Sequence, residues 1–93
     1  MPIVIIKSPP GSPAAADAVS RAATLAADIV LEADAAGLAL KDMLKGFCGT
    51  AFVNAEDAGE RLPAGAELEK GVRLLTGEEM EALLAGQEVL GPY

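Results

Sequence analysis

Lys7 and Ser8 are the residues best placed to bind a ligand, because they follow directly after an apolar run at residues 3–6. Such a run predicts a buried strand, and the ligands of open α/β sheets sit beyond the carboxyl ends of the strands. A lysine there could hold an anion, and a serine hydroxyl could donate a hydrogen bond to it. Residues 9–11, two prolines and a glycine, also indicate a plain loop, and we favour this simpler interpretation.

Four carboxylates, those of Glu32, Asp34, Glu56 and Asp57, follow two further apolar runs and are expected at the same edge of a sheet. Paired carboxylates can serve in acid/base catalysis or bind a divalent cation. Acidic residues are also expected at helix starts, where the helix dipole stabilises them. We therefore favour a role in capping helices and hydrating the surface, and we expect no metal and no cofactor.

Cys48 is the only cysteine of the chain, and histidine is absent. These two facts exclude an internal disulfide, a Cys/His zinc cluster and a nucleophile paired with histidine. A reactive thiolate needs a helix N-terminus or a nearby cation. Cys48 instead follows the helix expected at residues 38–45, and Lys45 is the nearest cation. We expect Cys48 to be a small buried hydrophobic residue and only a weak catalytic candidate.

Length, charge and glycine pattern disfavour several further classes of function. The chain has 93 residues, which suits one domain, and a net charge of −7, which disfavours direct binding to nucleic acid or to anionic membranes. The glycines match neither of the common phosphate-binding patterns. We find no apolar run long enough to span a membrane and no leader-like start. The expected location is the cytoplasm.

Apolar runs and turn signals alternate along the chain. Strands are expected at residues 3–6, 29–31, 50–53, 72–75 and 88–90. Helices are expected at residues 14–27, 38–45, 55–62 and 76–85. Ser12 and Pro13 resemble the N-cap and first residue of the first helix, whose buried face would be formed by Ala15, Val19, Ala22 and Ala26. Thr76 and Glu79 have the spacing of a capping box, and Gly46 is a helix stop.

This alternation predicts an α/β fold: a three-layer sandwich with a mostly parallel sheet of about five strands and helices on both faces. Parallel strands need crossover connections, which the expected helices supply. Apolar residues near the end of the sequence could complete the core or form a partner-facing patch, and both interpretations stay open. They are Met80, Leu83, Leu84, Val89 and Leu90.

The ordered set of segments resembles the TusB/DsrH family over nearly the whole chain. The residues that carry the resemblance are 5–9 (IIKSP), 28–36 (DIVLEADAA), 51–61 (AFVNAEDAGER) and 71–76 (GVRLLT). The resemblance implies a DsrE-like fold and hetero-oligomeric assembly with DsrE-like and DsrF-like subunits. It also implies a place in a sulfur relay that serves either 2-thiolation of the tRNA wobble uridine or dissimilatory sulfur oxidation.

The same resemblance implies that the main sulfur-carrying cysteine belongs to the DsrE-like subunit. The corresponding stretch here, residues 54–57, has no cysteine, and neither has the first helix, where some members of the family carry one. Cys48 matches neither of these two places. Three hypotheses follow: an accessory subunit without independent activity, a sulfurtransferase that carries persulfide on Cys48, and a homo-oligomeric DsrE-like protein that binds a small anion near Lys7 and Ser8.

Overall fold

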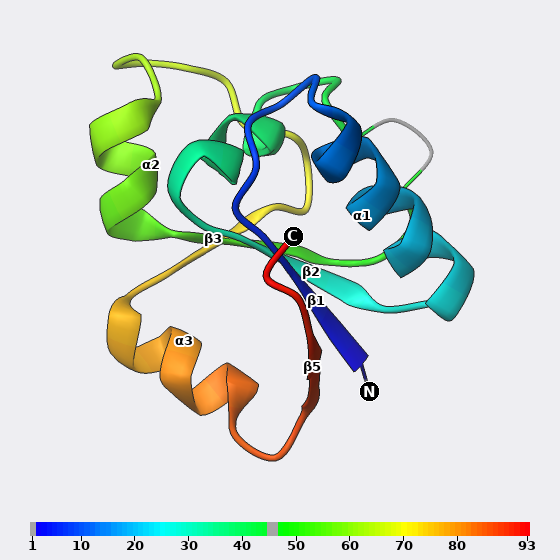
Figure 1. The fold of residues 1–93 in the computed structure, drawn as a ribbon. Helices are drawn as coiled ribbons and strands as arrows, with labels where there is room; N and C mark the ends of the chain where they lie inside the picture. Colours follow the sequence, from blue (N-terminus) through cyan, green and yellow to red (C-terminus); the bar gives the residue numbers. More distant parts are fainter. Residues whose placement is uncertain (1, 45–46) are drawn as a thin grey trace.

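The chain folds as alternating strands and helices, and the computed structural model describes residues 2–44 and 47–93 (Figure 1). The strands are β1 (Pro2–Ile6), β2 (Asp28–Leu31), β3 (Ala51–Asn54), β4 (Arg73–Leu75) and β5 (Glu88–Leu90). The helices are α1 (Pro13–Leu25), the 3₁₀-helix η1 (Ala33–Ala39), α2 (Ala55–Arg61) and α3 (Gly77–Leu84). Each of the expected strands is present, with ends that differ by one residue at most.

The strands form one five-stranded sheet in the order β4-β3-β2-β1-β5, and every neighbouring pair is parallel. The expected α/β fold with a parallel sheet is therefore confirmed. The chain steps outward from β1 to β4 and then returns across the sheet to β5. Because crossovers between parallel strands are right-handed, the outward steps place α1, η1 and α2 on one face, and the return step places α3 on the other.

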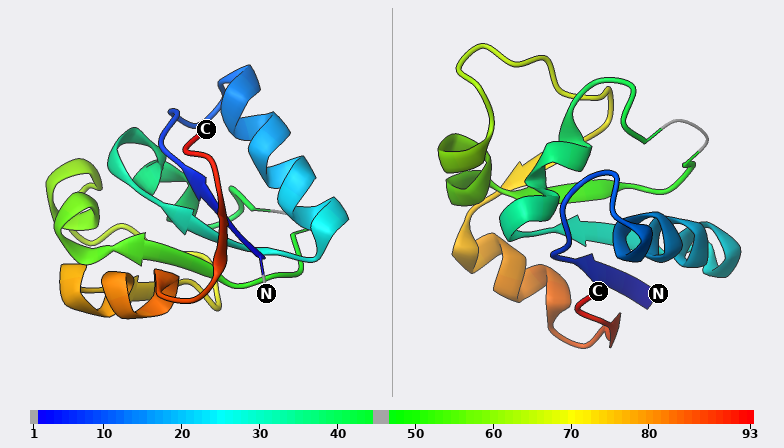
Figure 2. Two further views of the ribbon diagram at one scale, coloured as in Figure 1. Left: turned by 60° about the horizontal axis from the view of Figure 1, so that its bottom comes forward. Right: turned by 45° about the horizontal axis from the view of Figure 1, so that its top comes forward.

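Successive side chains of the strands belong alternately to two separate hydrophobic clusters. Val4 and Ile6 of β1 pack with α1 and η1, whereas Ile3 and Ile5 pack with α3. This alternation is what a strand covered on both faces requires. Helix α3 lies against the sheet from the side opposite to α1 and η1, as Figure 1 and Figure 2 show.

Helix α1 begins as its sequence indicates. The hydroxyl of Ser12 accepts a hydrogen bond from the amide of Ala15, and Pro13 occupies the first turn. The buried face consists of Ala15, Ala18 and Ala22, whose small side chains let the helix approach the sheet closely. The expected place of Ala26 on this face is wrong, because Ala26 is exposed and ends the helix in the left-handed conformation, with φ of 54°.

The helix expected at residues 38–45 is also wrong. The helical segment is η1, which lies earlier and ends at Ala39, and Leu40 is extended. Leu40 forms an antiparallel bridge with Leu68, and the amide of Lys41 donates to the carbonyl of Glu67. This pairing engages backbone groups that a helix through Leu40 would need, so the helix cannot continue. Lys45 and the expected helix stop at Gly46 lie outside the described residues.

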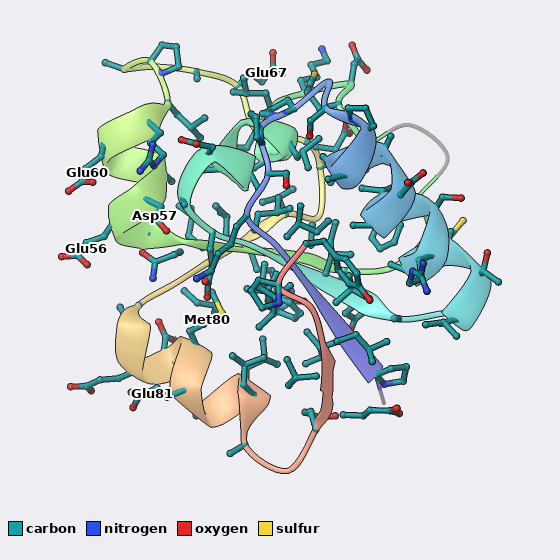
Figure 3. The ribbon with its side chains drawn as sticks, viewed as in Figure 1. Glu56, Asp57, Glu60, Glu67, Met80 and Glu81 are labelled. Atoms are coloured by element: carbon teal, nitrogen blue, oxygen red, sulfur yellow. The ribbon has the colours of Figure 1, made fainter. Side chains whose placement is uncertain are left out.

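Helix α3 confirms the capping box. The hydroxyl of Thr76 accepts from the amide of Glu79, and the Glu79 carboxylate accepts from the amide of Thr76. Met80 points from α3 toward the sheet, where it is buried, and Leu83 and Leu84 pack beside it (Figure 3). The sequence left undecided whether five apolar residues near its end belong to the core or to the surface. Val89, one of these five, is exposed. No helix among the described residues is long and apolar enough to cross a bilayer.

Candidate functional site

The carboxyl edge of the sheet gathers the polar residues that the sequence singles out. Lys7 follows β1 and Glu32 follows β2, and these two strands are neighbours in register. The Lys7 ammonium lies 3.7 Å from a carboxylate oxygen of Glu32, with both side chains partly exposed. An exposed pair at this distance adds little to stability, and it leaves the Lys7 side chain partly open to solvent.

Residues 91–93 cross the same edge beside β1. The backbone amides of Lys7 and Ser8 both donate to the main-chain oxygen of Tyr93, at 2.7 and 3.1 Å. The amide of Tyr93 donates in turn to the carbonyl of Ile5, at 3.0 Å. The place where an anion near Lys7 and Ser8 was expected is thus filled by the chain itself (Figure 2).

The four carboxylates of this edge do not converge on a common point. Asp34 pairs with Arg61 at 2.6 Å, and Asp57 accepts a hydrogen bond from the backbone amide of Ala33 at 2.9 Å. Glu56 points from α2 into the solvent, and Asp57 lies on the side of α2 that faces η1 (Figure 3). Within residues 2–44 and 47–93, no group of three or more His, Cys, Asp or Glu residues could hold a metal ion.

A shallow depression of about 550 Å³ lies further along this edge, between the starts of α2 and α3. Asn54 and Thr76, the caps of these two helices, line it together with Glu56 and Glu78. The cap oxygens already accept hydrogen bonds from the helix amides. The depression is therefore lined by engaged caps and acidic side chains, a poor environment for an anion.

Cys48 is exposed, so the expectation that it is a buried hydrophobic residue is wrong. Phe47 takes the inward position and packs against the core, which leaves the adjacent cysteine at the surface. Cys48 precedes β3 and lies at the amino edge of the sheet, opposite to Lys7. It lines a hollow of about 510 Å³ with Ala23 and Ala26 of the α1 end and with Asp28. Lys45, its expected cationic neighbour, is not among the described residues.

Two residues with structural roles at the edges escaped the sequence analysis. Asp28, at the start of β2, accepts a hydrogen bond from the amide of Thr50 and so fixes the entry into β3. Tyr93 packs against the core, and the guanidinium carbon of Arg21 lies 5.6 Å from the centre of its ring. An aspartate directly before an apolar run is a usable signal for the first role. Nothing in the sequence signals the second.

No family model, curated protein or solved structure matches this chain.

The family resemblance therefore rests on the sequence segments alone and stays a prediction. The geometry itself offers two chemically distinct places. One is the carboxyl edge, where Lys7 and Ser8 meet residues 91–93. The other is the amino edge, where the Cys48 thiol borders a hollow.

Proposed function

We propose that the chain is an accessory subunit of a sulfur-relay complex, without independent activity, that docks on subunits of DsrE-like and DsrF-like type. The reactive sulfur is carried by a partner's cysteine, and the complex serves tRNA 2-thiolation or dissimilatory sulfur oxidation. The observation that supports the proposal most directly is that the polar groups of the carboxyl edge bond to one another. They are engaged in the Lys7–Glu32 and Asp34–Arg61 pairs and in the bonds to Tyr93.

Two further features support this function. The five-stranded parallel sheet agrees with the DsrE-like fold that the sequence segments imply. The two edge strands present large apolar side chains to solvent: Leu74 of β4 is 51% exposed and Val89 of β5 is 39% exposed. Edge strands with apolar side chains are surfaces that partner chains commonly cover.

Affinity capture from the native host, followed by mass spectrometry, tests the proposal. We expect the tagged chain to recover DsrE-like and DsrF-like subunits, and we expect Leu74→Lys on the β4 edge to reduce that recovery. Leu25→Lys is the matched control, because Leu25 is 45% exposed and lies at the end of α1, which packs on β1 and β2. Recovery of self-associated chain only would contradict the proposal.

A second function, persulfide transfer through Cys48, is favoured by the exposure of that residue. In this reaction the thiolate of Cys48 attacks the outer sulfur of a donor persulfide. A new S–S bond forms at Cys48, the donor's S–S bond breaks, and the donor leaves as a thiolate. Sulfane-sulfur labelling of the wild type and of Cys48→Ser separates the two functions. Labelling that depends on Cys48 supports persulfide transfer, and equal labelling of both proteins excludes it.

A further inference from the structure

Residues 91–93, called the strap below, occupy the crevice that the strand order creates. In the order β4-β3-β2-β1-β5, the chain leaves β1 on one side toward β2 and returns to its other side at β5. The carboxyl ends of β1 and β5 therefore flank a topological switch point, where open α/β sheets bind their ligands. The strap follows β5 directly and closes this point.

The two backbone amides that the strap covers donate to a single oxygen atom. The N–H groups of two consecutive residues, Lys7 and Ser8, converge on one oxygen, that of Tyr93. Successive backbone amides that converge in this way form concave sites for anions. The Lys7 side chain belongs to one of these two residues and is 53% exposed, and its ammonium now lies 3.7 Å from the Glu32 carboxylate.

The loop that carries these amides is held in place without the strap. The amide of Glu32 donates to the carbonyl of Ile6, and the hydroxyl of Ser12 donates to the carbonyl of Pro9 at 2.7 Å. Pro10 packs so closely on Gly37 that a Cβ there would lie 2.8 Å from its ring. Departure of the strap would thus leave a loop that is still held in place, with two uncovered donors that water or another acceptor can engage.

The strap itself depends on few contacts. It is held by the three hydrogen bonds between Tyr93 and residues 5–8 and by the ring of Tyr93, which packs against the core and lies over Arg21. Gly91 passes so near β1 that a Cβ would lie 2.6 Å from the carbonyl oxygen of Ile5, and its φ is +102°. Any side chain at this position would push the strap off the strand.

We propose that the amides of Lys7 and Ser8 form a binding site for a small tetrahedral oxyanion, which the strap closes. In the open state an oxygen of the anion takes the place of the Tyr93 oxygen, and the Lys7 ammonium balances its charge. The strap and the anion compete for the same donors. The apparent affinity for the anion is therefore proportional to the fraction of molecules in which the strap is open. This inference does not depend on the proposed function.

Inorganic sulfate is the probe, and the chemical shifts of the Lys7 and Ser8 backbone amides are the readout, at ionic strength held constant with chloride. Gly91→Ala displaces the strap. Gly71→Ala is the matched control, because Gly71 has a similar φ of +92° but open space where the Cβ would stand. We expect sulfate to shift both amides in Gly91→Ala with an affinity at least about tenfold above that of the control.

Tyr93→Ala provides a second route to the open state, because it removes the ring contact and leaves Gly91 in place. It should raise the sulfate affinity in the same direction and keeps the proposal testable if Gly91→Ala does not fold. Amides that do not respond to sulfate in any variant that folds would overturn the proposal. Equal responses in Gly91→Ala and Gly71→Ala would overturn it as well, because the strap would then not govern access.

Discussion

At the scale of single residues, Asp57 joins two segments that lie far apart in the sequence. Its carboxylate accepts a hydrogen bond from the amide of Ala33, where the chain enters η1 with a positive φ of 51°. This bond satisfies a backbone donor and fixes an unfavourable backbone conformation for a residue with a Cβ. Asp57 is thus a structural residue at the edge where the sequence suggests an acidic site.

We predict that Asp57→Ala lowers the free energy of unfolding by about 1–3 kcal/mol, because the Ala33 amide loses its acceptor. Glu60→Ala is the control, since Glu60 is exposed on the same helix and points away from η1 (Figure 3). Urea denaturation followed by circular dichroism measures both values. An equal effect of the two substitutions would contradict the structural role of Asp57.

The exposure of Cys48 gives a second prediction at this scale. We expect iodoacetamide to modify the thiol in the folded protein, because Cys48 lies at the surface beside a hollow. Mass spectrometry after labelling, with and without urea, checks this. Modification only in urea would instead agree with the burial expected from the sequence.

At the scale of elements, caps decide where the helices begin. Ser12, Asn54 and Thr76 each accept hydrogen bonds from amides in the first turn of their helix. Such caps satisfy donors that have no partner inside the helix. The starts of α1 and α3 could therefore be predicted from local chemistry alone.

We predict that Thr76→Ala lowers the free energy of unfolding by about 1 kcal/mol, because it removes the acceptor of the Glu79 amide. Thr24→Ala serves as the control. Thr24 is exposed in α1, its hydroxyl donates only to the Ser20 carbonyl one turn earlier, and alanine is the better helix former. Thermal unfolding of both variants is the measurement. A loss in Thr24→Ala as large as that in Thr76→Ala would argue against the cap.

At the scale of the whole molecule, stability depends on the central strands. Val30 and Leu31 of β2 are fully buried, each in a different one of the two hydrophobic clusters. A domain of this size buries a modest part of its chain, and native proteins are stable by only about 5–15 kcal/mol. A single cavity in β2 therefore consumes a large share of the total stability.

We predict that Leu31→Ala lowers the free energy of unfolding by about 2–5 kcal/mol, through lost burial and a residual cavity. Leu74→Ala, a chemically identical change at a half-exposed edge position, should change it by no more than about 0.5 kcal/mol. Both values follow from urea denaturation of the isolated chain. A cost at Leu74 comparable to that at Leu31 would show that the β4 edge is packed rather than open.

The pattern of β-branched runs, loop signals and caps was sufficient to predict the parallel α/β fold and the ends of most elements. Those features act within a few residues, so local chemistry determines them. The 3₁₀-helix η1 could not be predicted, because it ends where Leu40 pairs with Leu68, a partner distant in the sequence. The packing of Phe47 against the core and the exposure of Cys48 likewise depend on how the core is filled.

The candidate sites also depend partly on local sequence and partly on contacts between distant segments. The sequence by itself determined that Lys7 and Ser8 stand at the carboxyl end of a buried strand, since strand and loop signals are local. Only the tertiary structure decided that Tyr93 accepts hydrogen bonds from their amides. It also decided that Asp34 pairs with Arg61 and that Asp57 accepts from the amide of Ala33, so that these carboxylates do not converge. The physical reason is that hydrogen bonds and packing between distant segments depend on the crossover path of the whole chain, which no short stretch of sequence encodes.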